Sequence, residues 1–444
     1  MGLTGIQIFK LLPKTNCGEC GSPTCLAFAM ALAAGKAELE KCPTISDEAK
    51  AQLSEASAPP IRQLTIGTGD YAVKIGGETV MFRHEKTFFN KPGLAILITG
   101  SMDDKEVSRR LAAVSELQYE RVGLNLRPEI VAVKDEGDKA RFLEIVKKAA
   151  AAPFSLILMS ADPAVMKEAL EAAKEKKPLI YAATAENAEA MAGLAKEYAC
   201  PLAAKAEGLE SLAALSEKLV SLGVKDIVLD SGARTVKGAF SDQVIIRRAA
   251  LQSKFKPFGF PTITLPCEMT DDIMKETLIA SAFIAKYASI MVLSDFAGEN
   301  VFPLLLERLN IYTDPQRPMT TEQGIYPINN PDASSPVLVT CNFSLTYFIV
   351  SGEIENSRVP AWLCVMDTEG LSVMTAWAAG KFVADTVGPF IKKSGIAEKI
   401  NHKKLIIPGY AAGILGDLEE ELPGWEITVG PREAAHIPAF LKNR

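Results

Sequence analysis

Short apolar runs alternate with longer amphipathic segments through the middle of the chain. Eight runs occur, at residues 94–99, 130–133, 156–159, 179–182, 201–204, 227–229, 262–265 and 290–293. Segments with a helical period, rich in Ala, Glu, Lys and Leu, lie at 138–150, 164–176, 188–197, 209–222 and 298–310. Eight strand–helix units over about 220 residues are the number in a TIM (β/α)8 barrel. We therefore expect an α/β chain with a central barrel, and a doubly wound sheet is the alternative.

The alternation restarts after a turn-rich passage at residues 314–332. The pattern predicts strands at 337–341, 362–366, 405–407 and 427–429, and helices at 344–355, 373–392, 414–421 and 433–441. This is typical of a separate Rossmann-like or flavodoxin-like domain. Ahead of the barrel, strand-like stretches at 64–66, 71–75 and 79–83 predict a short β segment, in which Gly76-Gly77 forms a hairpin turn.

The first 58 residues differ from both alternating regions. Their apolar spacing predicts short helices at 4–12, 26–39 and 46–57, and Ala58-Pro59-Pro60 predicts a linker. The predicted domains are therefore residues 1–58, a barrel with its leading hairpin at 59–322, and a C-terminal domain at 323–444. A chain of 444 residues is too long for one ordinary core, which agrees with this division.

Composition and charge narrow the class of protein. The chain is 48% hydrophobic and 23% charged, and its net charge of −6 argues against nucleic-acid binding through bulk charge. No uncharged apolar run approaches the ~20 residues of a membrane span, and we identify no secretion signal. Together with clustered free thiols, these features predict a cytoplasmic location.

Four of the eight cysteines lie in the first 42 residues, at Cys17, Cys20, Cys25 and Cys42. Their spacing, C-x2-C-x4-C-x16-C, lets three thiolates of a Gly/Pro-rich turn converge with a fourth that a short helix returns. Such a set binds a 4Fe-4S cluster or a structural zinc. There is one C-x2-C knuckle, and Pro43 follows the last cysteine as in the bacterial ferredoxin run, so we favour the cluster.

Polar residues follow several predicted barrel strands, at 99–104, 160–162, 230–234, 267–268 and 294–295. They could form a site of carboxylates and one arginine at the carboxyl end of the barrel. Ser, Thr and Asp are also the residues that cap helices after every barrel strand, and we give capping more weight. The three histidines, His84, His402 and His436, have no metal-site spacing, and no catalytic residue is assigned.

The loops after the C-terminal strands, at 340–344, 367–373, 408–413 and 430–434, are rich in glycine and hydroxyl groups. Glycine allows a backbone to approach a large flat ligand, and helix starts offer free N–H donors. No G-x-G-x-x-G follows the first of these strands, so a standard dinucleotide site is not expected. Capping and turn formation explain the same residues equally well.

The full chain resembles the large (gamma) subunits of corrinoid iron–sulfur proteins of the reductive acetyl-CoA (Wood–Ljungdahl) pathway. The most specific part is L-x-K-x-N-C-G-E-C-G-x-x-T-C at residues 12–25, followed by Cys42. The tail segments V-T-C-N-F-S-L-T-Y and M-D-T-E-G-L-S-V also match. The resemblance implies a 4Fe-4S cluster on Cys17, Cys20, Cys25 and Cys42 in a small mobile domain, a TIM barrel, and a C-terminal Rossmann-like domain that binds a corrinoid.

The resemblance further implies a methyl carrier that acts with partner enzymes rather than alone. Corrinoid cobalt(I) would accept a methyl group from methyltetrahydrofolate, bound on a separate methyltransferase, and deliver it to acetyl-CoA synthase. The cluster would reduce cobalt(II) when it forms, and a small (delta) subunit would complete a heterodimer. The corrinoid would be base-off, in agreement with the lack of a D-x-H-x-x-G motif. The implied corrinoid contacts are Thr340, Thr346, Gly370, Leu371, Ser372, Val373, Gly409, Tyr410 and Ala434.

Two other functions compete with this one. The first is a barrel oxidoreductase or electron-transfer subunit with a 4Fe-4S cluster and a flavin in the tail. The second is a scaffold subunit stapled by zinc, whose tail binds protein. In the methyl-carrier interpretation, Ala58-Pro59-Pro60 and residues 314–332 are expected to act as hinges.

Overall fold

The computed structural model describes residues 4–33, 37, 39–46, 49–50, 53, 59–121, 123–314 and 318–443. The chain divides into two compact units. The first comprises Met1–Met81, Phe89–Leu117 and Pro128–Leu304, and the second comprises Phe82–Phe88, Gln118–Arg127 and Leu305–Arg444. Linker residue Ala58, most of the helix predicted at 46–57, and residues 315–317 of the predicted hinge lie outside the described residues.

The N-terminal segment of the first unit has a small apolar core of its own. Helix α1 (Gly5–Leu11) starts at a capping box formed by Thr4 and Gln7, and α2 (Cys25–Ala33) packs against it. A Cβ atom on Gly5 would lie 3.3 Å from the Met30 Cα atom and would displace the Met30 side chain, so glycine favours this close helix contact. The bounds of α2 confirm the helix predicted at 26–39 up to residue 33, and the short turn η1 (Leu39–Lys41) follows later in the chain.

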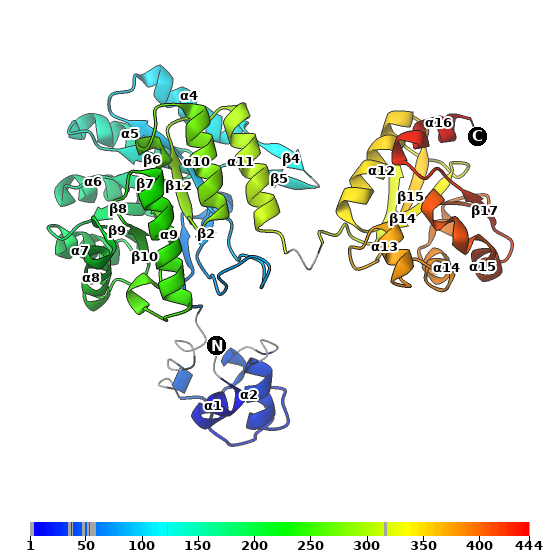
Figure 1. The fold of residues 1–444 in the computed structure, drawn as a ribbon, viewed down its shortest axis with the longest axis horizontal. Coiled ribbons are helices and arrows are strands. Elements are labelled where there is room, and N and C mark those ends of the chain that lie inside the picture. Colours follow the sequence, from blue (N-terminus) through cyan, green and yellow to red (C-terminus); the bar gives the residue numbers. More distant parts are fainter. Residues whose placement is uncertain are drawn as a thin grey trace. The chain divides into compact units, whose positions relative to one another are not determined.

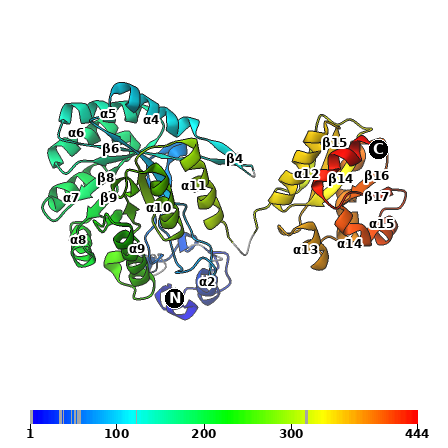
Figure 2. The same cartoon turned by 45° about the horizontal axis from the view of Figure 1, so that its top comes forward.

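Eight parallel strands form a nearly closed barrel in the first unit (Figures 1 and 2). They are β3 (Gly93–Thr99), β6 (Ile130–Lys134), β7 (Ser155–Met159), β8 (Leu179–Ala183), β9 (Leu202–Lys205), β10 (Ile227–Asp230), β11 (Ile263–Thr264) and β12 (Ile290–Leu293). The order is β10-β9-β8-β7-β6-β3-β12-β11, and a parallel bridge between Leu229 and Thr262 joins its two ends. All eight predicted strands are confirmed, because buried parallel strands have nearly continuous apolar sequences.

Helices surround these strands on the outside (Figure 2). They are α4 (Asp104–Glu116), α5 (Lys139–Ala151), α6 (Pro163–Ala173), α7 (Ala188–Glu197), α8 (Leu209–Ser221), α9 (Val236–Leu251), α10 (Ile273–Ala285) and α11 (Gly298–Ile311). Side chains of Asp103, Asp138, Asp162, Thr235 and Asp272 cap five of them. Of the polar loops named from the sequence, two supply such caps, through Asp103 and Asp162, as the capping interpretation predicted. The loops at 230–234 and 267–268 do not, because their charged side chains pair with each other.

An antiparallel pair, β1 (Leu64–Ile66) and β2 (Val73–Ile75), closes the amino-terminal end of the barrel. The Ser155 hydroxyl, at the start of β7, donates to the carbonyls of Ile66 and Tyr71. Two predictions were wrong here. Residues 79–83 are not a strand, and Gly76-Gly77 lies after β2 instead of turning the hairpin, since the Gly77 N–H donates to the Ile61 carbonyl. A further hairpin, β4 (Tyr119–Arg121) and β5 (Leu124–Leu126), was not predicted.

A five-stranded sheet forms the core of the second unit. Its strands are β13 (Gly324–Ile328), β14 (Val337–Cys341), β15 (Ala361–Met366), β16 (Lys404–Ile407) and β17 (Glu426–Val429), in the order β13-β15-β14-β16-β17. Strand β13 is antiparallel and lies in the passage predicted to be turns. The parallel strands run second–first–third–fourth, which is the flavodoxin-like order and places the topological switch between β14 and β16.

Helices cover both faces of this sheet (Figure 1). Helices α12 (Ser344–Ser357) and α16 (Ile437–Lys442) pack on one face, and α13 (Val373–Ala378), α14 (Ala384–Lys393) and α15 (Leu415–Glu421) on the other. The single helix predicted at 373–392 is wrong, because Gly380 adopts φ of 70° and the chain turns between α13 and α14. No helix in the described ranges is both long and apolar enough to cross a bilayer.

Candidate functional site

A pocket of ≈ 340 Å³ opens in the second unit at the switch between β14 and β16. The ends of both strands, the starts of α12 and α13, and the loops after β16 and β17 line it. Ligands in open α/β sheets bind at this position. Six of the nine residues implied as corrinoid contacts line the pocket, namely Thr340, Thr346, Ser372, Val373, Tyr410 and Ala434.

The other three implied residues, Gly370, Leu371 and Gly409, do not line the pocket but determine the conformation of the loops that do. A Cβ atom on Gly409 would lie 2.6 Å from the backbone nitrogen of Arg432, so this glycine lets the loops after β16 and β17 meet. Gly370 has φ of 74°, in the left-handed region that glycine adopts without strain. Leu371 packs against the core beneath α13.

The buried Asn342 holds the loop that leads into α13. Its Oδ1 atom accepts hydrogen bonds from the backbone N–H groups of Thr368 and Gly370, at 2.9 and 3.0 Å, and from the Thr368 hydroxyl. Its Nδ2 atom donates to Asp367. Since this side chain comes from the loop after β14, it couples two strand ends and fixes Ser372 and Val373 at the pocket.

Sequence reasoning missed three apolar helix residues that line the pocket. Ile349, Val350 and Met374 line it, and the side chains of Ile349 and Met374 are about half exposed. Ile349 and Val350 stand three and four residues after Thr346, so all three share one face of α12. This helical spacing from a candidate residue was the signal that could have identified them.

The pocket is mainly apolar, with a few polar groups at its rim. Thr340, Thr346 and Ser372 are among the lining residues, and Tyr410 donates a 2.7 Å hydrogen bond to Glu433 across two loops. That hydrogen bond raises the pKa of Tyr410. No histidine is among the lining residues. At ≈ 340 Å³ the pocket is at the small end of ligand sites.

The four N-terminal cysteines lie around one small core. Cys25 and Cys42 are buried in the apolar cluster of the N-terminal segment, Cys20 borders it, and Cys17 is exposed. Asn16 pairs with Cys25, because its side chain accepts from the Cys25 N–H at 2.8 Å while its own N–H points to the sulfur at 3.4 Å.

The cysteine loop turns at two glycines with open space beside them. Gly18 and Gly21 adopt φ of 76° and 81°, and nothing lies within 4 Å of a Cβ atom placed on either. Among the described residues, no three His, Cys, Asp or Glu side chains are yet arranged around one metal position. The donor set fits a cluster chemically, since it offers four thiols beside a small apolar core.

At the carboxyl end of the barrel, three predicted residues meet three that were not predicted. Arg234 forms two hydrogen bonds with Asp230, at 2.9 and 3.1 Å, one with the Tyr181 hydroxyl and one with Glu268. Glu268 also accepts from Lys134 at 2.9 Å. The ammonium group of Lys205 lies 5.9 Å from the centre of the Tyr181 ring. We call these residues the barrel-mouth cluster: Lys134, Tyr181, Lys205, Asp230, Arg234 and Glu268.

Burial and charge act together on this cluster. Burial and the neighbouring Asp230 raise the pKa of Tyr181 well above its usual value. Burial alone would raise the pKa of Glu268, but hydrogen bonds from Lys134 and Arg234 outweigh it and lower that pKa. Burial also raises the pKa of Cys267 to about 12, so its thiol stays protonated at neutral pH. Both the Tyr181 hydroxyl and the Cys267 thiol are therefore held in their protonated forms, whereas the Glu268 carboxylate is held ionised.

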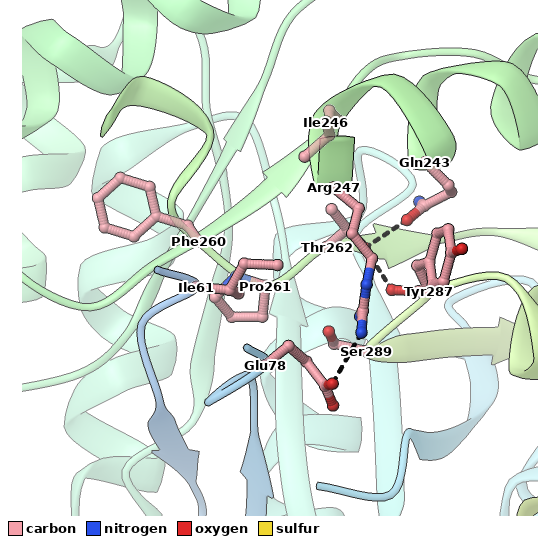
Figure 3. Close-up of a pocket in the computed structure, with 10 residues that line it drawn as sticks. All are labelled: Ile61, Glu78, Gln243, Ile246, Arg247, Phe260, Pro261, Thr262, Tyr287 and Ser289. Carbon is pink, nitrogen blue, oxygen red and sulfur yellow. Dashed lines mark hydrogen bonds and ion pairs between the residues drawn. The ribbon is translucent and has the colours of Figure 1, made fainter. Parts of the chain in front are cut away.

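A cavity of ≈ 10 Å³ near the amino-terminal end of the barrel is a structural feature (Figure 3). Arg247 of α9 pairs with Glu78 at 2.9 Å, and both side chains are almost fully buried. The guanidinium group also donates to the Val80 carbonyl and stacks on the ring of Tyr287. The space holds about one water molecule, so we assign it to packing.

The remaining sequence candidates have ordinary surroundings. The His402 ring contacts the Ser335 carbonyl at 3.0 Å, and His84 stacks on Phe82. Cys200, Cys341 and Cys364 are buried.

Comparison with known proteins gives matches along the whole chain. Residues 63–441 match a family described as "CO dehydrogenase/acetyl-CoA synthase delta subunit", and residues 12–44 match one described as "Putative Fe-S cluster". The corrinoid/iron-sulfur protein large subunit of Moorella thermoacetica is 46% identical over 100% of this chain and 99% of its own. The acetyl-CoA decarbonylase/synthase complex subunit gamma of Methanopyrus kandleri is 37% identical over 99% of this chain and 98% of its own.

The barrel also resembles solved structures of low similarity. Dihydropteroate synthase from Thermus thermophilus aligns with 56% of this chain and 96% of its own, at 14% identity and a TM-score of 0.39. This likeness is too low to support an inference about function.

Proposed function

The chain belongs to the family of corrinoid/iron-sulfur protein large subunits and acetyl-CoA decarbonylase/synthase gamma subunits, and we propose from this that it is a corrinoid-dependent methyl carrier. In this function it accepts a methyl group from methyltetrahydrofolate through a methyltransferase and delivers it to acetyl-CoA synthase. The proposed domains are an iron–sulfur module at 1–58, a TIM barrel at 59–322, and a Rossmann-like corrinoid-binding domain at 323–444.

The pocket at the switch between β14 and β16 is the observation that carries the proposal. The implied contacts came from a resemblance in sequence, and six of the nine line this one pocket. A corrinoid supplies a cobalt atom that, in its reduced state, acts as a nucleophile toward methyl groups. The protein's part is to bind one face of the macrocycle against Ile349, Val350 and Met374, and to place hydroxyl donors at its edge.

The lining of the pocket agrees with a corrinoid that has no protein ligand below the metal. Histidine is not among the lining residues, and neither is cysteine. Tyr410 cannot serve as an anionic ligand at neutral pH, because its hydrogen bond to Glu433 raises its pKa. A metal without a strong axial donor is poorer in electron density, which makes its reduction easier.

The N-terminal segment is proposed to hold a 4Fe-4S cluster on Cys17, Cys20, Cys25 and Cys42. Such a cluster supplies single electrons at low potential. Cys25 stands at the first position of α2, and its backbone N–H donates to the Asn16 side chain, which holds the start of the helix against the cysteine loop. The apolar core around Cys25 and Cys42 keeps water from one side of the site.

The shape of the pocket also supports a partner subunit. Because the pocket covers one face of a large ligand, the opposite face needs another surface to exclude water. Exposed apolar residues at or near the rim, including Leu345, Ile349, Met374 and Trp377, are suited to such a contact. The small (delta) subunit is the proposed partner, with the methyltransferase and acetyl-CoA synthase as transient ones.

The test is anaerobic co-purification with the small subunit, followed by metal analysis and visible spectroscopy with and without a low-potential reductant. The expected result is about one cobalt and four irons per chain, with a cobalt(I) band after reduction. Iron without cobalt, from an assembled heterodimer, would contradict the carrier function. A flavin spectrum would then favour the oxidoreductase alternative, and one zinc without iron would favour the scaffold.

A further inference from the structure

The barrel-mouth cluster contains one more cationic side chain than it contains carboxylates. Three cations, Lys134, Lys205 and Arg234, stand against two carboxylates, Asp230 and Glu268. All five N–H bonds of Arg234 are used, by Asp230, Glu268, the Tyr181 hydroxyl and the Ala233 carbonyl. Arg234 is therefore a fixed part of the wall and has no donor left for a further group.

The carboxylates of the cluster are satisfied in the same way. Asp230 accepts from Arg234, from the Tyr181 hydroxyl and from the Gly232 N–H, and its side chain is 3% exposed. Glu268 accepts from Lys134 and Arg234. Neither carboxylate is left over to neutralise Lys205.

Lys205 is the cation without an internal partner. Within the described part of the chain, its ammonium group makes no hydrogen bond or ion pair, and its one contact of this kind is the face of the Tyr181 ring. Ala203 belongs to the apolar interior of the barrel, and side chains two residues apart on a strand face the same side. Lys205 therefore points into the mouth of the barrel.

Other acidic groups near this end of the barrel are engaged elsewhere. Glu136 accepts from the Ser101 N–H, Asp135 from the Ser160 hydroxyl, and Glu276 from Ser294. Beneath the cluster, the floor is apolar, since Met159 and Leu265 are buried in the interior and Leu97 packs against them. A charged rim over an apolar floor is a suitable site for a small organic anion.

We propose that the barrel-mouth cluster binds a small organic anion, with Lys205 as the main donor and Lys134 as the second. The bound group is a carboxylate or a phosphate, and its uncharged part rests on the apolar floor. Lys134 spends one of three N–H bonds on Glu268, so it retains donors for the ligand. This site is independent of the corrinoid and the cluster, and it gives the barrel a binding function at the end where barrels carry their sites.

The test uses isothermal titration calorimetry on the full chain, purified with the subunit and cofactors that accompany it. Inorganic phosphate and acetate are titrated separately, up to about 10 mM, which reaches the range of millimolar Kd values. The expected result is one saturable site for at least one of the probes. Saturation by phosphate alone identifies a phosphate ligand, and saturation by acetate alone identifies a carboxylate.

Two substitutions of Lys205 and one control locate the site. Lys205→Met is expected to weaken binding at least tenfold, and Lys205→Arg to retain it within about threefold, because the charge is kept. Lys225 is an exposed lysine just before β10, at the opposite end of the barrel, so Lys225→Met should bind like the wild type. Lys205→Gln serves as a second neutral variant if Lys205→Met does not fold.

Two results would overturn the proposal. One is the lack of a saturable site for both probes in the wild type. The other is unchanged affinity in a folded neutral variant of Lys205, which would place the anion elsewhere. Neither result depends on whether the chain carries methyl groups, since corrinoid content is measured separately on the same samples.

Discussion

Two regions at the carboxyl ends of parallel strands have opposite chemistry. In the barrel, that end carries a charged rim in which Asp230, Arg234 and Glu268 hold each other. In the five-stranded sheet, the same end leaves an apolar pocket of ≈ 340 Å³ with a few hydroxyls. The position of a site therefore follows from topology, whereas the ligand that it takes follows from the side chains that the strand ends carry.

The difference also separates stability from binding. A network of buried charges stabilises only while every member is present, because an unpaired charge in a buried place is costly. A pocket with few internal hydrogen bonds loses little when one side chain changes, and the loss appears in ligand affinity instead. Substitutions in the two regions should accordingly affect different measurements.

Asp230→Ala should have the largest effect on stability. It leaves Arg234 and Tyr181 without their buried partner and should lower the free energy of unfolding by about 3–5 kcal/mol. Urea unfolding followed by circular dichroism measures this loss. The control is Asp226→Ala, which removes an exposed pair with Arg62 and should cost less than about 1 kcal/mol. Equal losses in the two variants would show that the barrel-mouth cluster does not stabilise the barrel.

Gly409→Ala should lower both the stability of the second unit and its cofactor content. The added Cβ atom would lie 2.6–2.7 Å from backbone atoms of residues 430–432, which cannot move as a flexible side chain could. Overpacking of this kind costs about 1–3 kcal/mol, and we expect cobalt content to fall as well. Gly413→Ala is the matched control, because nothing lies within 4 Å of its Cβ position. A Gly409→Ala protein with full cobalt content would contradict this role of the two loops.

The local sequence pattern predicted the eight barrel strands well, but it predicted strand β13 and the region of Gly76-Gly77 poorly. The eight barrel strands are buried on both sides, so each is a continuous apolar run that the sequence reveals directly. Strand β13 lies in the passage predicted to be turns and contains Pro327, and proline usually indicates a turn. The structure tolerates this proline because β13 is an edge strand of the sheet. Gly76-Gly77 has the sequence of a hairpin turn, but contacts with residues 61–62 determine its conformation. Those residues lie about 15 positions away in the sequence, so a local pattern does not reveal the contacts.

The two sites differ in the same respect. The loops around Thr340, Ser372 and Tyr410 follow strands that were identified correctly, so their convergence could be predicted from topology. Lys134, Tyr181 and Lys205 lie within barrel strands, where their inward direction is known only once the barrel is built. For the loops of Asp230 and Glu268 we therefore gave capping more weight than a site of carboxylates, because the partners of these residues were not visible in the sequence.

Thr346→Val should affect binding without affecting stability. Thr346 is half-buried at the pocket and valine has nearly the same shape, so the free energy of unfolding should stay within about 0.5 kcal/mol of the wild type. Loss of one hydrogen bond should weaken cofactor binding by about 0.5–1.5 kcal/mol, or roughly threefold to tenfold. Competition for limiting corrinoid measures the change. An unchanged affinity would remove Thr346 from the proposed contacts.

The smallest expected effect tests whether the ion pairs of the barrel act through charge. Hydrogen bonds from Lys134 and Arg234 lower the pKa of Glu268 below its ordinary 4.5 in the folded protein. Glu268 therefore contributes stability above about pH 4.5, and this contribution is lost as the pH falls through the lowered value. Burial raises the pKa of Glu276 in the same barrel, so its contribution is present below pH 4.5 and is lost as the pH rises through the raised value.

These two glutamates give opposite slopes, which makes a small effect measurable. Relative to the wild type, the destabilisation caused by Glu268→Gln should decrease as the pH falls below 4.5. The destabilisation caused by Glu276→Gln should increase as the pH falls toward 4.5. The pH-dependent part for the partly exposed Glu268 should be below about 1 kcal/mol. Urea unfolding of both variants over this pH range tests the signs. Slopes of the same sign would show that shape, and not charge, determines how these side chains stabilise the barrel.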